Sequence, residues 1–222
     1  MARASLFAAL PDDLANVLFG GARSVALATD QTLFLAGDAG NGCYRVEKGL
    51  LKVSMVSRSG TERILAILGP GAIVGELAMI DGRPRSASVV ALKDAELTFV
   101  SKGTFDEFAE RHHEVYEYLV KVLAARIRET DAAMAAVSFL PLKGRLATTM
   151  LELAEHFGHD VGSGRILIRQ KFGQADFAAM AGIARENVSR ILNDWKRRHL
   201  VSRISGYYCL ENRDKLKAEI DH

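Results

Sequence analysis

Glycines recur at short intervals between residues 31 and 100 and restrict this part of the chain to short extended segments. They separate runs in which apolar and polar side chains alternate, the pattern of strands with one face toward a core. Turn residues at intervals of roughly 8–12 residues, with no helix-length segment between the runs, predict an antiparallel sandwich or barrel. The expected strands cover residues 32–35, 43–46, 51–56, 63–68, 72–74, 86–91 and 96–100.

The following segment, residues 104–137, contains neither glycine nor proline and predicts helices with a break near residues 111–113. Within it, side chains recur at alternating steps of four and three residues, which is heptad spacing. Such a stripe packs either on its own domain or on the same helix of a second chain. Because the polar Thr130 interrupts it, a typical device for register or ligand access, we favour a parallel two-chain coiled coil. The stripe consists of Tyr116, Val120, Leu123, Ile127, Thr130, Met134 and Val137.

Pro141 marks the end of the helical segment, because the residue before a proline is pushed out of the helical region. We place a domain boundary there. The rest of the chain predicts an amphipathic helix, a loop, a short strand, two helices and a terminal hairpin with Gly206 in its turn. The corresponding ranges are 143–157 for the first helix, 158–164 for the loop, 165–168 for the strand and 202–210 for the hairpin.

Charge is unevenly distributed along a chain whose formal net charge is only +2. Residues 1–140 carry 15 lysines and arginines against 17 acidic residues, whereas residues 141–222 carry 14 against 10. Between Arg165 and Arg203 the balance is 9 basic to 3 acidic residues. A basic segment joined to a slightly acidic body is typical of a sensor attached to a domain that binds a polyanion.

Several sequence features indicate the cellular compartment of the protein. No apolar stretch approaches the roughly 18–20 residues that a membrane crossing needs. Residues 1–10 predict a helix rather than a signal peptide, because Pro11-Asp12-Asp13 stands where a cleavage site would be. The two cysteines, Cys43 and Cys209, are far apart, which excludes a cysteine-held iron–sulfur cluster and fits a reducing compartment. We therefore expect a cytoplasmic protein without a membrane segment, with both cysteines packed in the core.

Metal and catalytic sites are not expected. Gly158 separates His156 from His159, and no third ligand lies close in sequence. Glu76 or Asp81 would lack a nucleophile or metal partner as an acid or base. The sequence predicts neither an enzyme nor a cofactor.

Residues 174–192 have the spacing of a helix-turn-helix. Ala178 is small where two helices would cross, and Gly182 can take the left-handed conformation that ends the first helix. Ile183, Val188 and Ile191 would fill the space between the helices.

The second helix of this motif carries the donors and acceptors that base recognition needs. Its N-terminal end is the part that enters a major groove. Arginine can donate two hydrogen bonds to guanine, and glutamate can accept from cytosine N4. A solvated charged face is the alternative, which the motif spacing and local charge disfavour. The expected DNA-binding residues are Gln174, Arg185, Glu186, Ser189, Arg190 and Lys196, and the basic run 196–199 suits phosphates.

Residues 71–89 are rich in groups that bind anions. Gly75 permits close backbone approach, Glu76 is an acceptor suited to a sugar hydroxyl, and Arg85 with Ser86 can clamp a phosphate. An alternative is a structural ion pair between Glu76 and Arg85, which their spacing alone favours.

Two of these motifs carry a resemblance to a known family. Gly75-Glu76-Leu77-Ala78 followed by Arg85-Ser86-Ala87-Ser88 resembles the phosphate-binding cassette of cyclic-nucleotide-binding domains. With the long helix and the helix-turn-helix, nearly the whole chain resembles the cyclic AMP receptor branch of the CRP/FNR transcription-factor family. The resemblance implies an α+β fold with three parts. They are an antiparallel, jelly-roll-like β-roll over 1–112, a dimerisation helix over 113–138 and a winged helix-turn-helix domain over 139–222.

The resemblance also implies roles for individual residues. Glu76 takes the ribose 2′-hydroxyl, Arg85 pairs with the cyclic phosphate, and the base faces the long helix at Thr130. Asp131 stands where the well-known activator has a serine, so its carboxylate could accept from adenine or from guanine. Cyclic AMP is therefore the first expectation and cyclic GMP the second, as an allosteric ligand rather than a cofactor. The remaining cassette positions are Gly75, Leu77, Ser86 and Ala87.

The implied function is a homodimeric transcription regulator that binds a TGTGA-like inverted repeat in double-stranded DNA. RNA polymerase would be a further partner. Two alternatives stay open on the sequence: a nucleotide-independent regulator with a vestigial pocket, and a signalling adaptor that does not bind DNA.

Overall fold

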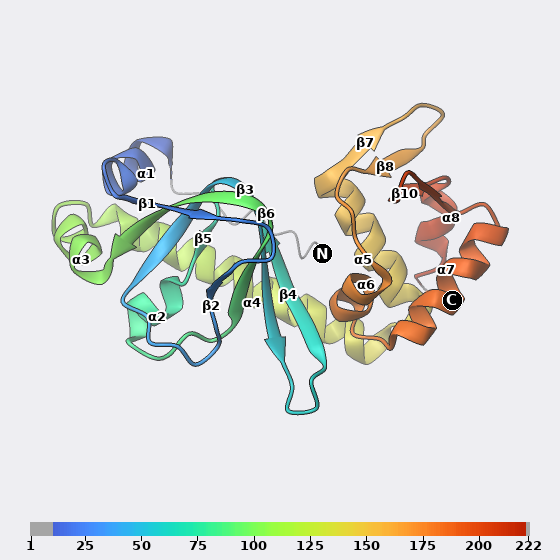
Figure 1. Cartoon of the computed structure of the whole chain (residues 1–222), viewed down its shortest axis with the longest axis horizontal. Helices are drawn as coiled ribbons and strands as arrows, with labels where there is room; N and C mark the ends of the chain where they lie inside the picture. Colours follow the sequence, from blue (N-terminus) through green and yellow to red (C-terminus); the bar gives the residue numbers. More distant parts are fainter. Residues whose placement is uncertain (1–10, 221–222) are drawn as a thin grey trace. The chain divides into compact units, whose positions relative to one another are not determined.

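The computed structural model describes residues 11–220, so the helix expected over residues 1–10 lies outside the described residues. The described chain divides into two compact units. The β unit comprises residues 11–56 and 64–128, and the helix-turn-helix unit comprises residues 57–63 and 129–220. Figure 1 shows both units with most of their elements labelled.

The β unit is built on one antiparallel sheet with strand order β1-β6-β3-β4, in which β2 also pairs with β6 and β5 with β3. This confirms the antiparallel architecture. Strand β1 was not expected. The elements from the N-terminus are α1 (Asp12–Phe19), β1 (Arg23–Leu27), β2 (Thr32–Phe34), β3 (Gly42–Val56), β4 (Glu62–Leu68), β5 (Ile73–Val74), α2 (Glu76–Asp81), β6 (Ser88–Ser101), α3 (Lys102–Arg111) and α4 (Glu114–Phe139).

Two long strands replace pairs of shorter ones that the glycine spacing predicted. Residues 43–46 and 51–56 both belong to β3, and 86–91 and 96–100 fall largely within β6. At Gly49 the register between β3 and β6 shifts instead of ending, and φ there is +90°. A Cβ on Gly49 would lie 2.3 Å from the Asp94 carbonyl oxygen, so this glycine marks a bulge where two strands come very close.

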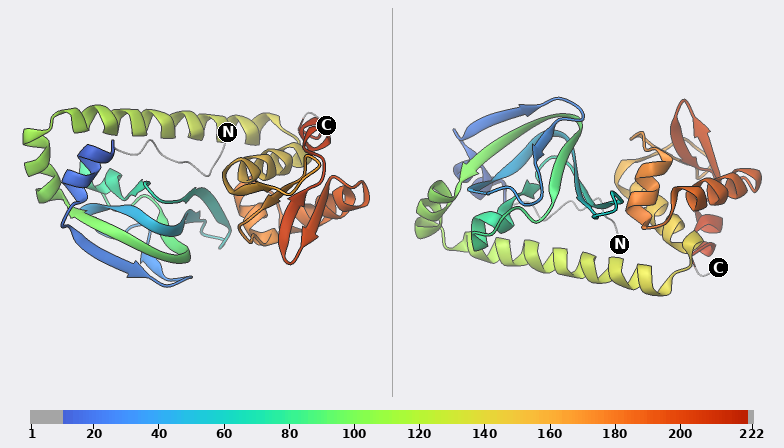
Figure 2. Two further views of the ribbon diagram at one scale, coloured as in Figure 1. Left: turned by 90° about the horizontal axis from the view of Figure 1, so that it is seen from above. Right: turned by 60° about the horizontal axis from the view of Figure 1, so that its bottom comes forward.

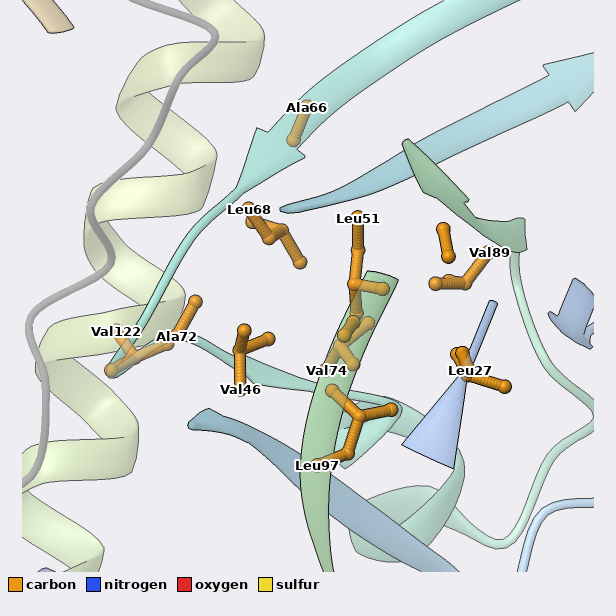
Figure 3. Packing of buried hydrophobic residues seen from close by; sticks show 12 residues of the cluster. Leu27, Val46, Leu51, Ala66, Leu68, Ala72, Val74, Val89, Leu97 and Val122 are labelled. Atoms are coloured by element: carbon orange, nitrogen blue, oxygen red, sulfur yellow. The ribbon is translucent and has the colours of Figure 1, made fainter. Parts of the chain in front are cut away.

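The main core of the β unit lies among the strands of the sheet, and Val122 adds a contact from α4. Figure 3 shows Val122 of α4 beside Ala72, with Val46 next to them. Leu51, Leu68 and Leu97 have no exposed surface, and burying a side chain of this kind contributes roughly 1.5–3 kcal/mol. Apolar burial therefore fixes the first half of α4 on the β unit. The labelled cluster comprises Leu27, Val46, Leu51, Ala66, Leu68, Ala72, Val74, Val89, Leu97 and Val122.

Helix α4 carries two parallel apolar stripes. The break expected near residues 111–113 is confirmed, because α3 ends at Arg111 and α4 begins at Glu114. Val115, Leu119 and Val122 face the core, whereas the heptad stripe lies open: Val120 is 64% exposed. Most of the stripe therefore does not pack on its own domain, although Leu123 is half-buried and the Tyr116 ring contacts Phe105. Its other exposed apolar members are Tyr116, Ile127, Met134 and Val137. Figure 2 shows α4 as one unbroken helix.

The helix-turn-helix unit combines four helices with a small sheet of order β7-β8-β10-β9. The expected helices, strand and hairpin are confirmed, and Gly206 has φ +89° in the hairpin turn. The predicted loop over 158–164 is wrong at its start, because its first residues pair with β8. Helix α8 was not expected. The elements are α5 (Leu142–Phe157), β7 (Gly158–Asp160), β8 (Ile166–Ile168), α6 (Gln174–Ala181), α7 (Arg185–Arg197), β9 (Val201–Ile204), β10 (Tyr207–Leu210) and α8 (Arg213–Ala218).

None of the helices within residues 11–220 is both long enough and apolar enough to span a bilayer. In the same part of the chain, no group of three or more His, Cys, Asp or Glu side chains is arranged to hold a metal ion.

Candidate ligand site and DNA-recognition surface

The candidate ligand site begins where β5 meets α2. Gly75 joins them with φ +85°, a left-handed conformation that costs other residues free energy. A Cβ at this position would also lie 2.4 Å from Arg85 Nη1. Only glycine meets both conditions, and the turn brings the backbone against Arg85. The predicted role of Gly75 toward a ligand stays a prediction.

Arg85 is buried, with 5% of its surface exposed. Its Nη1 donates to the carbonyl oxygens of Gly42 at 2.9 Å and Gly75 at 2.6 Å. Its guanidinium carbon lies 4.4 Å from the centre of the Phe34 ring. Burial lowers the pKa of Arg85, yet an arginine starts so high that it stays charged. Its buried Nε has no hydrogen-bond partner among the described residues. A fixed, buried cation with an unused donor is suited to an anion.

Glu76 is 1% exposed and pairs with Arg126 of α4 rather than with Arg85. Arg126 Nη1 donates to Glu76 Oε1, and its Nη2 donates to the carbonyl oxygen of Ile73 at 3.1 Å. The alternative of a structural Glu76–Arg85 ion pair is therefore wrong. Burial raises the pKa of Glu76, and the Arg126 guanidinium opposes that rise. The second carboxylate oxygen, Oε2, is buried and has no hydrogen-bond partner in the part of the chain that the structure describes.

Arg126 is the residue that the sequence prediction missed. A usable signal exists, because Val115, Leu119, Val122 and Arg126 follow one another at steps of four, three and four residues. Arg126 thus continues the stripe by which α4 packs on the β unit.

The other cassette residues differ in exposure. Ser86 is exposed, Leu77 is half-buried, and Ala87 is buried immediately before β6. Cys43 lies beneath the cassette and is 2% exposed, which confirms it as a core residue. Burial, with Glu76 adding to the effect, raises the pKa of its thiol to about 12, so the thiol stays protonated.

Thr130 and Asp131 lie on α4 and are both exposed. They follow Arg126 by four and five residues, and they belong to the helix-turn-helix unit, whereas the cassette belongs to the β unit. Their contact with a base stays a prediction.

The helix-turn-helix has the local geometry that the sequence predicted. Gly182 ends α6 in the left-handed conformation, with φ +66°. Val188 and Ile191 are buried and Ile183 is half-buried, so these three fill the space between the helices as expected. The Asp176 carboxylate accepts from the backbone N–H of Gly173 at 2.7 Å and fixes the start of α6.

The residues assigned to DNA recognition lie on the open side of this motif. Arg185, Glu186 and Arg190 are exposed on α7, and Arg190 donates to Asn187 Oδ1 at 2.9 Å, which holds its side chain. The other expected DNA-binding residues are half-buried, namely Gln174, Ser189 and Lys196. Their roles toward DNA stay predictions.

A second group of residues missed by the sequence prediction holds the end of α7. The buried Glu219 accepts from Trp195 Nε1 at 2.9 Å and from Arg198. Arg198 also donates to Asp194 at 3.3 Å. Hydrogen bonding to Arg198 holds the pKa of Glu219 below its usual range. Arg198 belongs to the basic run expected on phosphates, but its side chain ties α7 to the end of α8.

Two protein families match most of this chain. Residues 24–112 match the cyclic nucleotide-binding domain family, and residues 144–219 match the Crp-like helix-turn-helix domain family. The cyclic AMP receptor protein of Thermus thermophilus is 34% identical over 161 residues, covering 72% of this chain and 71% of that protein. The chain belongs to the CRP/FNR family of transcription regulators.

Other members of the CRP/FNR family agree with this assignment. The CRP-like cAMP-activated global transcriptional regulator of Mycobacterium tuberculosis is 28% identical over 198 residues, 89% of this chain and 88% of that protein. The catabolite activator protein of Thermus thermophilus is 27% identical in sequence, with a TM-score of 0.54 and 97% of each chain covered. A CooA variant from Carboxydothermus hydrogenoformans, 21% identical, shares the fold with a TM-score of 0.81 over 98% of this chain and 99% of that one.

This CRP/FNR regulator therefore joins a cyclic nucleotide-binding domain to a DNA-binding helix-turn-helix and is not an enzyme. Family membership also excludes the adaptor that does not bind DNA. Chemically, the cassette offers a buried cation and a buried carboxylate, each with one polar atom that has no hydrogen-bond partner within residues 11–220.

Proposed function

We propose that this regulator is a homodimer that binds a cyclic mononucleotide, cyclic AMP in preference to cyclic GMP, and a TGTGA-like inverted repeat. The observation that carries the proposal is the pair of unpartnered buried atoms, Arg85 Nε and Glu76 Oε2, in one cassette. A buried polar atom without a partner costs about 1–3 kcal/mol, so a ligand that supplies the partner gains that free energy. A cyclic phosphate oxygen suits the guanidinium, and a ribose hydroxyl suits the carboxylate.

The Glu76–Arg126 ion pair supports coupling between ligand and helix. A ribose 2′-hydroxyl that donates to Glu76 adds a partner to a carboxylate that already holds α4 through Arg126. Occupancy of the cassette therefore acts on the same helix that carries the exposed stripe. The ligand shifts the equilibrium between conformations only by its difference in affinity for them.

The open stripe on α4 supports homodimer formation through a two-chain seam. Ile127 and Met134 are 62% and 61% exposed, an unfavourable state for large apolar side chains at heptad spacing. In the paired helices, Thr130 and Asp131 would meet the base. Asp131 would accept from the adenine amino group, or from the N1–H and N2 amino group of guanine.

The exposed face of α7 supports recognition of a TGTGA-like half-site. Arg185 and Arg190 would donate to guanines, and Glu186 would accept from cytosine N4. Gln174, Ser189 and Lys196 would complete the contact. A two-fold dimer places two such helices on an inverted repeat. Because the operator would lie on the chromosome, we place the regulator in the cytoplasm, with RNA polymerase as a partner.

Isothermal titration of the full chain with cyclic AMP and cyclic GMP tests the sensor proposal. We expect wild type to bind at least one nucleotide in the micromolar range. We expect Arg85→Ala, which loses a charge-assisted contact of about 2–3 kcal/mol, to bind at least 30-fold more weakly. An unchanged melting temperature would show that the variant is folded. Absence of binding by wild type at high micromolar nucleotide would refute the proposal.

One observation favours the second candidate, a nucleotide-independent regulator. Arg85 already donates to two backbone carbonyls, so its Nη1 is satisfied without a ligand. Fluorescence anisotropy on an inverted-repeat duplex separates the candidates. Tighter binding with nucleotide supports the sensor, whereas equal binding with and without nucleotide supports the second candidate.

A further inference from the structure

The side chain of Phe34 is aimed by an irregularity in β2. In a regular strand, Leu33 and Phe34 would point to opposite faces of the sheet. Both pack against the core of the β unit. The pairing of β2 with β6 shifts register between Thr32 and Phe34, where Thr32 pairs with Val90 and Phe34 with Val89. A bulge of this kind redirects a side chain, and such bulges are common beside functional sites.

The redirected ring lies against the Arg85 guanidinium. The distance from the guanidinium carbon to the ring centre is 4.4 Å, within the range of a cation–π interaction. Phe34 is the end of an aromatic row, with Tyr44 at 6.2 Å and Phe99 at 4.9 Å from Tyr44 between ring centres. The Phe34 ring therefore packs on Tyr44 and also contacts Arg85.

The hydrogen bonds of Arg85 use Nη1 and leave Nε without a partner among the described residues. The guanidinium donors all lie in one plane. Two carbonyl oxygens hold Nη1, and Phe34 contacts the group, so the plane is fixed. A Cβ on Gly40 would lie 2.8 Å from Nε, and glycine leaves that space empty. The orientation of the guanidinium plane sets the direction of the Nε–H. We therefore expect Nε to meet a phosphate oxygen only while that orientation is kept.

We propose that Phe34 is a positioning residue for the anion site: its ring, aimed by the β2 bulge, holds the Arg85 guanidinium plane so that Nε meets the phosphate of the ligand. This rests on the proposed binding of a cyclic nucleotide. The role needs an aromatic face, since an aliphatic side chain fills the space without attracting the cation.

The test compares nucleotide affinity across variants of the full chain by isothermal titration with cyclic AMP. Phe34→Leu and Phe34→Met remove the aromatic face and keep most of the volume. A cation–π interaction of about 1–2 kcal/mol corresponds to a 5- to 30-fold loss of affinity, which we expect for both. Phe34→Tyr keeps the face, so its affinity should lie within about twofold of wild type.

Phe99→Leu is the matched control. Phe99 belongs to the same aromatic row, but the ring at the Arg85 guanidinium is that of Phe34. It should bind within about twofold of wild type. Equal losses in Phe34→Leu and Phe99→Leu, or an equal loss in Phe34→Tyr, would show a packing role and overturn the proposal, as would wild-type affinity in Phe34→Leu. If wild type itself binds no cyclic nucleotide, it is the proposed function that fails.

Discussion

Replacing Arg126 with methionine tests whether the Glu76–Arg126 pair holds α4 to the cassette. Arg126→Met keeps an unbranched chain but leaves the Glu76 carboxylate, 1% exposed, without its cation. Breaking a buried ion pair from one side costs about 3–5 kcal/mol. We expect urea unfolding followed by circular dichroism to show a loss of that size at pH 8, with an unchanged slope.

The loss should depend on pH in a defined direction. Burial raises the pKa of Glu76 above its unfolded value, and the rise is larger once Arg126 no longer opposes it. A raised pKa in the folded state means that the folded protein binds the proton more tightly. Proton binding to Glu76 therefore stabilises the folded state. This stabilisation is complete below the pKa of Glu76 in the unfolded chain, and it disappears as pH rises through the pKa of Glu76 in the folded protein. The deficit of Arg126→Met should therefore be small near pH 4 and grow toward pH 8.

Two comparisons make this prediction refutable. Arg128→Met removes an exposed arginine from the same helix and should change stability by less than about 0.5 kcal/mol. The double variant Glu76→Gln with Arg126→Met removes both charges, so it should recover part of the lost stability and show no rise in deficit with pH. A deficit that stays constant from pH 4 to 8, or a double variant no more stable than Arg126→Met, would contradict the reasoning.

Three further changes address other parts of the molecule. Glu219→Gln weakens the charged contact with Arg198 and should lower the melting temperature by an amount that corresponds to about 2 kcal/mol at pH 7. Because the folded pKa of Glu219 is depressed, wild type should lose this advantage as pH falls below about 4, and a constant difference would contradict the assignment. Val120→Glu should shift the mass in light scattering from dimer to monomer, whereas Val17→Glu, at a 61% exposed position outside α4, should leave it unchanged. Asp131→Ser should shift the ratio of affinities toward cyclic AMP by about 10-fold, and an unchanged ratio would remove Asp131 from the base site.

Features set by a single stretch of chain could be predicted from the sequence. Gly75, Gly182 and Gly206 all have positive φ, because a left-handed position is a local steric requirement that glycine meets at little cost. Pro141 likewise lies between α4 and α5, since its ring acts on its immediate neighbour. These positions locate the cassette, the helix-turn-helix and the boundary between helices.

Features set by contacts between distant segments could not be predicted in the same way. Gly49 has the same left-handed conformation as a turn residue, yet it lies within β3 because β6 passes close to it. Glu76 and Arg126 are 50 residues apart, and Trp195 and Glu219 are 24 apart. The sequence shows that a buried carboxylate would need a cation, but the identity of that cation depends on how α4 packs.

The two stripes on α4 would let one helix serve both the proposed ligand site and the proposed dimer seam. Successive residues of an α-helix are about 100° apart, so the stripe that contains Val115 and Arg126 and the stripe that contains Val120 and Ile127 lie on neighbouring faces of α4. Arg126 and Ile127 are adjacent in sequence, one in contact with Glu76 and the other exposed. A change in the Glu76 contact that rotates α4 about its axis therefore turns the seam by the same angle. Because packed interfaces tend to have two alternative arrangements, we expect such a rotation to select between two seams. Both partners of the proposed dimer would have to adopt it together.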